Sequence, residues 1–156
     1  MRSRVAAVSV DLDEVTEYTR IHDLPAFGEG DPGRHAVYEQ AVARIEAWAR
    51  ALSIPITFFA VGRDLARPEN AAGMRRTVGL GHAVESHSLS HRYDLSRLSR
   101  EEIRREVSEG LSAVERATGV RPAGFRAPGY TVSDALFDAL DEAGVRFDSS
   151  VFPSPV

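Results

Sequence analysis

The chain has 156 residues, of which 43% are hydrophobic and 27% are charged, and these values are ordinary for one globular domain with a buried core. Its formal net charge of −4 gives no electrostatic reason to expect nucleic acid or an anionic membrane as the partner. The chain contains no cysteine, which excludes disulfide bonds and thiolate metal ligands.

The start of the chain, Met1-Arg2-Ser3-Arg4, carries the positive charge of a secretory signal. The apolar run that follows stops at Asp11, so it is too short for the hydrophobic part of such a signal. No stretch approaches the ~20 apolar residues of a membrane span. We therefore expect a cytoplasmic protein without a transmembrane segment, while association with the cell envelope and a leader outside this sequence stay open.

The first half of the chain alternates apolar runs with amphipathic segments. Val5–Val10 predicts a strand, and a loop with several glycines and prolines follows it as far as Gly33. Ile54–Val61 is β-branched and aromatic and predicts a buried strand. Between them, apolar residues recur at helical spacing and predict one helix face: Val37, Ala41, Ile45, Trp48 and Leu52.

The second half continues this alternation. A helix is expected around Glu69–Val78 and a strand at Ala83–Ser86. Ser99 and Glu102 form a capping box that opens a long helix, and Gly119 ends it. The remaining predicted elements are, in order, a short strand reaching Phe125, a helix capped by Ser133 that ends near Gly144, and a strand at Val145–Asp148.

Strands that alternate with helices predict a parallel sheet connected by right-handed crossovers. On this pattern alone, an open doubly wound sheet and an incomplete barrel both fit. The last apolar segment, Phe147–Pro153, reads as the end of a strand with no covering helix after it.

Polar residues that could do chemistry gather where predicted strands end, which is where ligands bind in α/β folds. Asp11 and Asp13 follow the first strand. In an extended chain they point to one side, where two carboxylates repel each other unless a cation lies beside them. The alternative is an acidic loop or helix start, in which carboxylates are favoured without any ligand.

Two further clusters follow later strands. His87 and His91 are spaced so that both imidazoles can face one point on a helical turn, as zinc ligands do, or they are capping or surface histidines. His82, at the other end of the same strand, is expected to be structural. The segment from Arg126 to Tyr130 contains proline and glycine, which force a tight turn. That turn either holds the arginine near the carboxylates or is a plain turn with a surface arginine.

In this order, the three clusters resemble the motifs of the polysaccharide deacetylases of carbohydrate esterase family 4, which include the nodulation-type chitooligosaccharide deacetylases. Asp11-Leu12-Asp13 is similar to the first motif, His87-Ser88-x-x-His91 to the His-Ser/Thr-x-x-His motif, and Arg126-x-Pro128 with Tyr130 to the Arg-x-Pro-aromatic motif. The resemblance extends from Val5 to Pro153. It implies an irregular (β/α) barrel related to the seven-stranded deacetylase barrel and incomplete at its C-terminal side.

The resemblance also implies a role for each residue. Three residues would bind a divalent metal, most often Zn²⁺, although Co²⁺ and Ni²⁺ suit the same ligands: Asp13, His87 and His91. Asp11 would be the general base, Arg126 would pair with it and hold it ionised, and Tyr130 would offer its backbone N–H to the oxyanion. The implied reaction is hydrolysis of an N-acetyl or related acyl group on a carbohydrate such as peptidoglycan, chitooligosaccharide or a lipid-linked sugar.

Two features depart from the family pattern. Leu12 separates aspartates that are adjacent in many members, and Gly129 is inserted before the aromatic residue. Both variants resemble a sub-branch with peptidoglycan-type deacetylases, lipid-linked-sugar deformylases and metal-free ureide hydrolases, so a cyclic ureide or imide is an alternative substrate. The separation also leaves open which carboxylate is the ligand and which is the base, with Glu14 as a third candidate.

The family's later motifs supply a hydrophobic wall for the acyl group and a histidine that protonates the leaving amine. No residue after Asp148 matches them, and His22, His35 and His82 stand outside any matching motif. We therefore expect residues 1–156 to be a single catalytic domain without its C-terminal part, with slow turnover. A relative that binds metal or carbohydrate without catalysis is a third interpretation, and a homo-oligomer stays open.

Overall fold

The computed structural model describes residues 6–28 and 30–152, which form an α/β fold around a parallel sheet. Within these residues the sheet contains, in spatial order, β1 (Val8–Leu12), β2 (Ile56–Ala60), β3 (Ala83–Ser86), β4 (Gly124–Phe125) and β5 (Phe147–Asp148). Each strand pairs in parallel with the next one along the chain. Because every crossover moves in the same direction, the strands form an arc of a barrel, whereas a doubly wound sheet reverses at a switch point.

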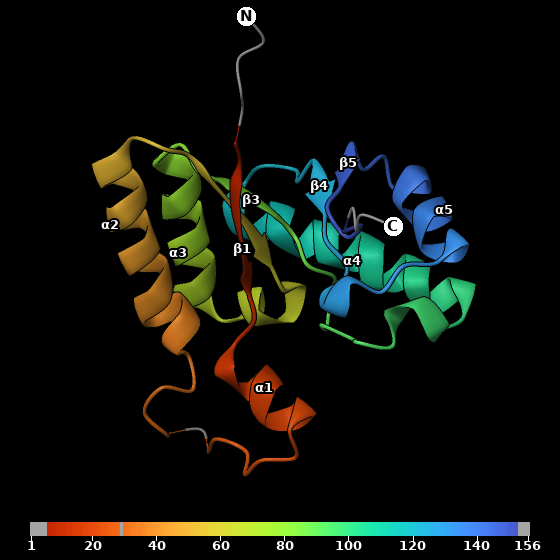
Figure 1. Cartoon of the computed structure of the whole chain (residues 1–156), viewed down its shortest axis with the longest axis horizontal. Helices are drawn as coiled ribbons and strands as arrows, with labels where there is room; N and C mark the ends of the chain where they lie inside the picture. The colour runs from red at the N-terminus through yellow and green to blue at the C-terminus, as the bar shows by residue number, and fades with distance from the viewer. Residues whose placement is uncertain (1–5, 29, 153–156) are drawn as a thin grey trace, which may run out of the picture.

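Helices connect and cover the strands. The α-helices are α1 (Val15–Ile21), α2 (Val42–Leu52), α3 (Pro68–Gly79), α4 (Arg100–Thr118) and α5 (Asp134–Glu142). Shorter helical turns are η1 (Val37–Ala41, a π-helix), η2 (Gly62–Ala66), η3 (Leu95–Arg97) and η4 (Pro128–Tyr130). Figure 1 shows α2 and α3 toward the β1 edge, α4 behind the strands and α5 toward the β5 edge, whereas α1 lies apart, beyond the end of β1. No helix in the described part of the chain combines the length and the apolar character that a bilayer crossing needs.

Side-chain alternation gives the sheet an apolar outer face and a more polar inner face. Ile56, Phe58 and Ala60 of β2 pack against the helices, in a core that also contains Leu12, Tyr38, Val42, Ala49, Leu65, Met74, Val84, Val114 and Ala117. A second core forms between β4, α4 and α5 around Leu95, Ile103, Val107, Leu111, Phe125, Ala127, Leu136, Ala139 and Leu140. The alternate positions Ser9 and Asp11 face the concave side, where polar groups of several strands can meet.

Most predicted elements are confirmed. The capping box of Ser99 and Glu102 opens α4, and Gly119 ends it in a left-handed conformation. β1 ends at Leu12 rather than Val10, so Asp11 belongs to the strand itself, and Val5 lies outside the described residues. β5 is shorter than expected, because only Phe147–Asp148 pairs with β4.

Two predictions for the first half of the chain are wrong. The segment after β1, expected as loop, contains α1, a short helix without a periodic apolar face. Trp48 and Leu52, expected on the buried face of α2, are 50% and 53% exposed, whereas Tyr38 and Ala49 are buried. The reason is η1, because a π-helical turn holds more residues than an α-helical turn and shifts the buried face along the sequence.

Candidate metal and catalytic site

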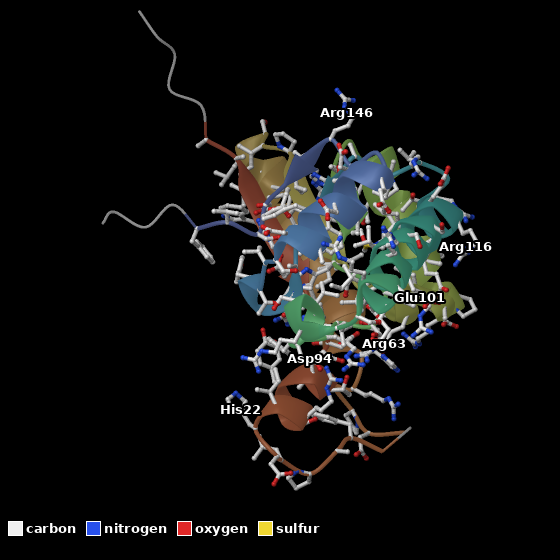
Figure 2. All side chains as sticks on the ribbon, turned by 90° about the vertical axis from the view of Figure 1, so that its right-hand side faces the viewer. His22, Arg63, Asp94, Glu101, Arg116 and Arg146 are labelled. Carbon is white, nitrogen blue, oxygen red and sulfur yellow. The ribbon has the colours of Figure 1, made fainter. Side chains whose placement is uncertain are left out.

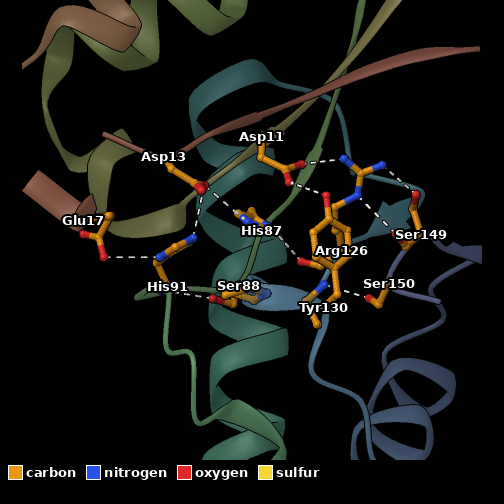
Figure 3. A network of polar contacts seen from close by, with 12 residues as sticks. Asp11, Asp13, Glu17, His87, Ser88, His91, Arg126, Tyr130, Ser149 and Ser150 are labelled. Carbon is orange, nitrogen blue, oxygen red and sulfur yellow. Dashed lines mark hydrogen bonds and ion pairs between the residues drawn. The ribbon is translucent and has the colours of Figure 1, made fainter. Parts of the chain in front are cut away.

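The three predicted metal ligands converge at the C-terminal end of the strands. Nε2 of His87 lies 3.3 Å from Oδ1 of Asp13, and Nε2 of His91 lies 3.1 Å from the same oxygen. These atoms lie within 4.8 Å of one another, and Figure 3 shows them pointing toward one spot. Both histidines are buried. Glu14, the third carboxylate considered, is not part of this group.

A strained loop brings the two histidines together. His87 follows β3 directly, and its N–H extends the ladder to the carbonyl oxygen of Ala60 at 2.9 Å. Ser88 and His91 have φ angles of 63° and 56°, a left-handed conformation that costs roughly 1–3 kcal/mol in a non-glycine residue. The expectation of a helical turn is therefore wrong, because this segment is not helical and two left-handed residues aim the imidazoles instead.

Helix α4 holds this loop in place. The Glu106 carboxylate accepts the N–H of Ser90 at 2.9 Å and its hydroxyl at 2.6 Å. The Glu106 carbonyl oxygen accepts the N–H of Leu89 at 3.0 Å. A Cβ at Gly110 would lie 2.7 Å from the carbonyl carbon of Ser88. Glycine at this position therefore allows the helix and the histidine loop to touch.

The outer nitrogens of both histidines are occupied, which fixes how their inner nitrogens face the site. Nδ1 of His87 lies 2.7 Å from the carbonyl oxygen of Arg126, and Nδ1 of His91 lies 3.2 Å from Oε2 of Glu17. A carbonyl or carboxylate oxygen only accepts, so each Nδ1 carries the proton. In the neutral rings, both Nε2 lone pairs then point toward Asp13.

Three acceptors that face one another call for a cation. Oδ1 of Asp13 and Nε2 of His91 are buried without a hydrogen-bond partner among the described residues. Ligand atoms around a tetrahedral zinc lie about 3.3 Å apart, since each bond is about 2.0 Å long, and the two separations from Asp13 match this value. One carboxylate and two neutral imidazoles fit Zn²⁺, Co²⁺ or Ni²⁺.

Burial and neighbouring charges move the pKa values of the two carboxylates in opposite directions. Burial by itself raises the pKa of Asp13, but in the absence of a cation, hydrogen bonds and positive charge from protonated His87 and His91 more than offset it and hold this pKa well below its usual range. Burial raises the pKa of Glu14 to about 7, with a weak opposing contact from the Val37 N–H at 3.4 Å. Asp13 is therefore the carboxylate suited to a cation near neutral pH.

The second aspartate, Asp11, pairs with Arg126 instead of with the histidines. The guanidinium donates to Oδ1 of Asp11 at 2.6 Å and to the hydroxyls of Ser9 at 2.8 Å and Ser149 at 2.7 Å. It also lies 4.1 Å above the centre of the Phe59 ring, a cation–π contact. Arg126 is thus fixed on every side, and Figure 3 shows Asp11 held between it and the metal ligands.

The turn after β4 places Tyr130 beside Asp11. The Tyr130 hydroxyl donates to Oδ2 of Asp11 at 3.3 Å. Gly129 and Tyr130 both have positive φ angles, and a Cβ at Gly129 would lie 2.6 Å from the Tyr93 ring, so the inserted glycine is required here. The Tyr130 N–H, expected to face an oxyanion, donates to the carbonyl oxygen of Ala127 at 3.0 Å. An oxyanion would share this N–H with Ala127.

Several polar residues around the site were missed by sequence reasoning. Glu17 contacts His91, Ser149 contacts Arg126, and the hydroxyl of Ser150 accepts the Ala127 N–H at 2.7 Å. The pair Ser149-Ser150 directly follows the last strand, which was the available signal. Glu17 lies in the segment read as loop and gave none. His82 lies outside the site, where its Nδ1 accepts the Ile56 N–H at 3.2 Å, as expected for a structural residue.

The chain matches known proteins along most of its length. A family model described as polysaccharide deacetylase matches residues 31–147. A bifunctional xylanase/deacetylase of Pseudobutyrivibrio xylanivorans is 24% identical over 111 residues, which is 71% of this chain and 17% of that protein.

Solved structures share the fold. A candidate polysaccharide deacetylase of Mycobacterium smegmatis is 24% identical with a TM-score of 0.77, over 93% of this chain and 50% of that one. A family 4 acetyl xylan esterase of Clostridium thermocellum, in complex with a cobalt ion, is 23% identical with a TM-score of 0.64, over 86% and 54%. A family 4 pseudoenzyme of Bacillus anthracis is 20% identical with a TM-score of 0.68, over 91% and 41%. The chain thus spans about half the length of these structures.

Proposed function

Because the chain belongs to the polysaccharide deacetylase family, we propose that it is a divalent-metal hydrolase that removes N-acetyl or related acyl groups from a carbohydrate. Peptidoglycan, chitooligosaccharide and lipid-linked sugars are the substrates that we consider. One observation carries the proposal: a carboxylate oxygen and two imidazole nitrogens, all acceptors, face one another at the strand ends. An oriented carboxylate, Asp11, stands beside them.

In this proposal Asp13, His87 and His91 hold Zn²⁺, or Co²⁺ or Ni²⁺ in its place. When bound, the cation polarises the acyl carbonyl and makes water a better acid at neutral pH. The acetyl xylan esterase of similar fold, solved with a cobalt ion, supports this choice of metal class. The buried surroundings of both histidines exclude bulk water from one side of the site and strengthen its electrostatic interactions.

Asp11 then acts as the general base that takes the proton of the attacking water. A base must be held within hydrogen-bond reach of that water. The ion pair with Arg126 at 2.6 Å fixes one oxygen of Asp11, and the other faces the Tyr130 hydroxyl at 3.3 Å. The Tyr130 N–H stabilises the tetrahedral oxyanion, a contribution of about 3–4 kcal/mol per donor. Its shared bond with Ala127 makes the lower part of that range the expectation.

A second candidate function is metal or carbohydrate binding without efficient catalysis. The fold shared with a pseudoenzyme of family 4 favours it. The fixed geometry of Asp11 and Arg126 speaks for catalysis, because a protein that only binds does not need an oriented base.

The test measures bound metal and deacetylation of chitooligosaccharide in the same samples, with zinc and with chelator. We expect His87→Ala and His91→Ala to lose metal and activity together, and Asp11→Asn to keep the metal and lose activity. His22→Ala is the matched control, since His22 is exposed at the end of α1 and outside the metal group (Figure 2). It should behave as the wild type.

Three outcomes would contradict the proposal in different ways. Loss of metal from Asp11→Asn would mean that the two aspartates have the reverse roles. Amide hydrolysis by a sample that elemental analysis finds free of metal would exclude the metal mechanism and favour a ureide or imide substrate. Stoichiometric metal without deacetylation would favour the binding function.

A further inference from the structure

The mechanism above gives no role to Glu17, a buried charge that contacts the proposed ligand His91. Glu17 of α1 is 2% exposed, although glutamate is rarely buried unless it is paired. Its carboxylate forms ion pairs with Arg20 at 2.5 Å and with Arg63, and Oε2 lies 3.2 Å from Nδ1 of His91. Figure 3 shows Glu17 on the far side of His91 from Asp13, so the imidazole lies between two carboxylates.

The two arginines that pair with Glu17 also bind the histidine loop. Arg20 donates to the carbonyl oxygen of His91 at 3.0 Å, and Arg63 donates to that of Ser90 at 3.0 Å. Figure 2 places Arg63 where the segment carrying α1 meets the rest of the molecule. The cluster of Glu17, Arg20 and Arg63 therefore holds both the backbone and the ring of His91, and two of its members belong to α1, which has no residue in either hydrophobic core.

We propose that Glu17 is a positioning residue that fixes the tautomer and orientation of His91 and raises its affinity for the cation. A carboxylate that accepts the Nδ1–H keeps the lone pair on Nε2 and makes the imidazole a stronger ligand. His87 receives only a neutral carbonyl oxygen at the equivalent nitrogen. The two histidines are thus unequal ligands, and His91 is the one whose strength depends on α1. This inference rests on the proposed metal site.

A structural role for Glu17 predicts something different. If Glu17 only neutralised Arg20 and Arg63, its removal would lower the stability of the fold and leave the metal affinity of the folded protein unchanged. Glu46 provides the matched control, because it is also a nearly buried glutamate. It accepts the Thr77 hydroxyl at 2.6 Å and lies in α2, outside the metal group.

The experiment compares wild type, Glu17→Ala, Glu17→Gln and Glu46→Ala. Zinc affinity is measured by competition with a chromophoric chelator, and the ¹⁵N resonances of the His91 ring are recorded in the metal-free proteins. We expect Glu17→Ala to bind zinc about 10–100-fold more weakly than the wild type. Glu17→Gln, which keeps an acceptor oxygen, should lose less, and Glu46→Ala should bind as the wild type does. The His91 tautomer with its proton on Nδ1 should predominate in the wild type. In Glu17→Ala this preference should disappear.

Each result decides a separate point. Equal zinc affinity of folded Glu17→Ala and wild type would overturn the positioning role and leave the metal site intact. If Glu17→Ala does not fold, Glu17→Gln provides the test. Unchanged zinc affinity together with unchanged ¹⁵N resonances of the His91 ring in Glu17→Gln would refute the positioning role. Absence of zinc binding by the wild type would overturn the metal site itself and this inference with it.

Discussion

Asp11 and Asp13 stand two positions apart at the end of β1 and take different partners. Asp13 faces two imidazoles, and Asp11 faces a guanidinium held by two serine hydroxyls. Leu12 between them is fully buried in the core, which turns both carboxylates toward the concave side. The separation by Leu12 thus directs the two aspartates to different partners, Asp13 to the proposed cation site and Asp11 to Arg126.

Glu14 next to them allows a prediction at the same scale. Its side chain is nearly fully buried, and burial raises its pKa from 4.5 to about 7. A carboxyl whose folded pKa is raised stabilises the fold while it is protonated, and this contribution is lost as pH rises from about 4.5 through 7. At pH 8 the ionised wild type therefore bears a cost of up to about 3 kcal/mol.

We expect Glu14→Gln to equal the wild type in unfolding free energy at pH 4 and to exceed it by up to about 3 kcal/mol at pH 8. Urea unfolding of both proteins in chelator measures the difference without a contribution from bound metal. A difference that is the same at both pH values would show that ionisation of Glu14 has no part in it.

At the scale of elements, the histidine loop depends on how closely α4 approaches it. Glu106 binds the loop through three hydrogen bonds, and Gly110 leaves the space in which Ser88 lies. The capping box of Ser99 and Glu102 fixes where this helix begins, and so sets which residue faces the loop. A local signal in the sequence thereby helps to position a site far from it along the chain.

Gly110→Ala should disrupt this contact. Its Cβ would lie 2.7 Å from backbone of Ser88 and 2.9 Å from that of Leu89, and neither can move without the histidines. We expect a loss of about 1–3 kcal/mol in unfolding free energy, as for other overpacked sites, together with weaker zinc binding.

Gly73→Ala in α3 is the matched control for this substitution. A Cβ there has no heavy atom within 4 Å, and alanine is the better helix former, so we expect a gain of about 0.5–1 kcal/mol and unchanged zinc affinity. Unfolding by denaturant and a zinc titration of both variants give the comparison. Wild-type affinity in Gly110→Ala would mean that the loop adjusts without moving its ligands.

Across the whole molecule, polar contacts bridge strands that are not neighbours in the sheet. Arg126 follows β4 and reaches Asp11 and Ser9 on β1, across the concave side of the arc. The proposed cation would add a second link, between the end of β1 and the loop after β3. The Arg126 contacts thus link β1 to the end of β4, two strands that the hydrogen bonds of the sheet do not join.

Metal should therefore stabilise the entire fold. A ligand that binds only the folded state at 100 times its Kd adds about 2.7 kcal/mol to the unfolding free energy. We expect zinc to raise the melting temperature of the wild type, chelator to reverse the rise, and His91→Ala to show neither effect. A zinc response of the same size in His91→Ala would place the stabilising ion elsewhere.

Local patterns in the sequence were sufficient to predict most of the secondary structure and the location of the candidate site. The alternation of strands and helices, the caps at Ser99 and Ser133, and the polar residues at strand ends depend on neighbours within a few positions, and the structure agrees with them. That the aspartates and the histidines share one edge of the sheet followed from one rule, because parallel strands bring their C-terminal ends to the same edge, whereas the choice of Asp13 over Asp11 came from the family resemblance.

Other features were decided only by tertiary structure. Strand order distinguishes a barrel arc from a doubly wound sheet, and it depends on which strands pair, which no local pattern encodes. The π-helical turn shifted the buried face of α2, and the short helix α1 lacks a periodic face of its own. Glu17 contacts His91 across 74 positions of sequence, and only folding brings Arg63 and the histidine loop beside its charge. Propensity and periodicity act over a few residues, whereas these contacts arise from the closure of long loops, and for that reason only the folded chain reveals them.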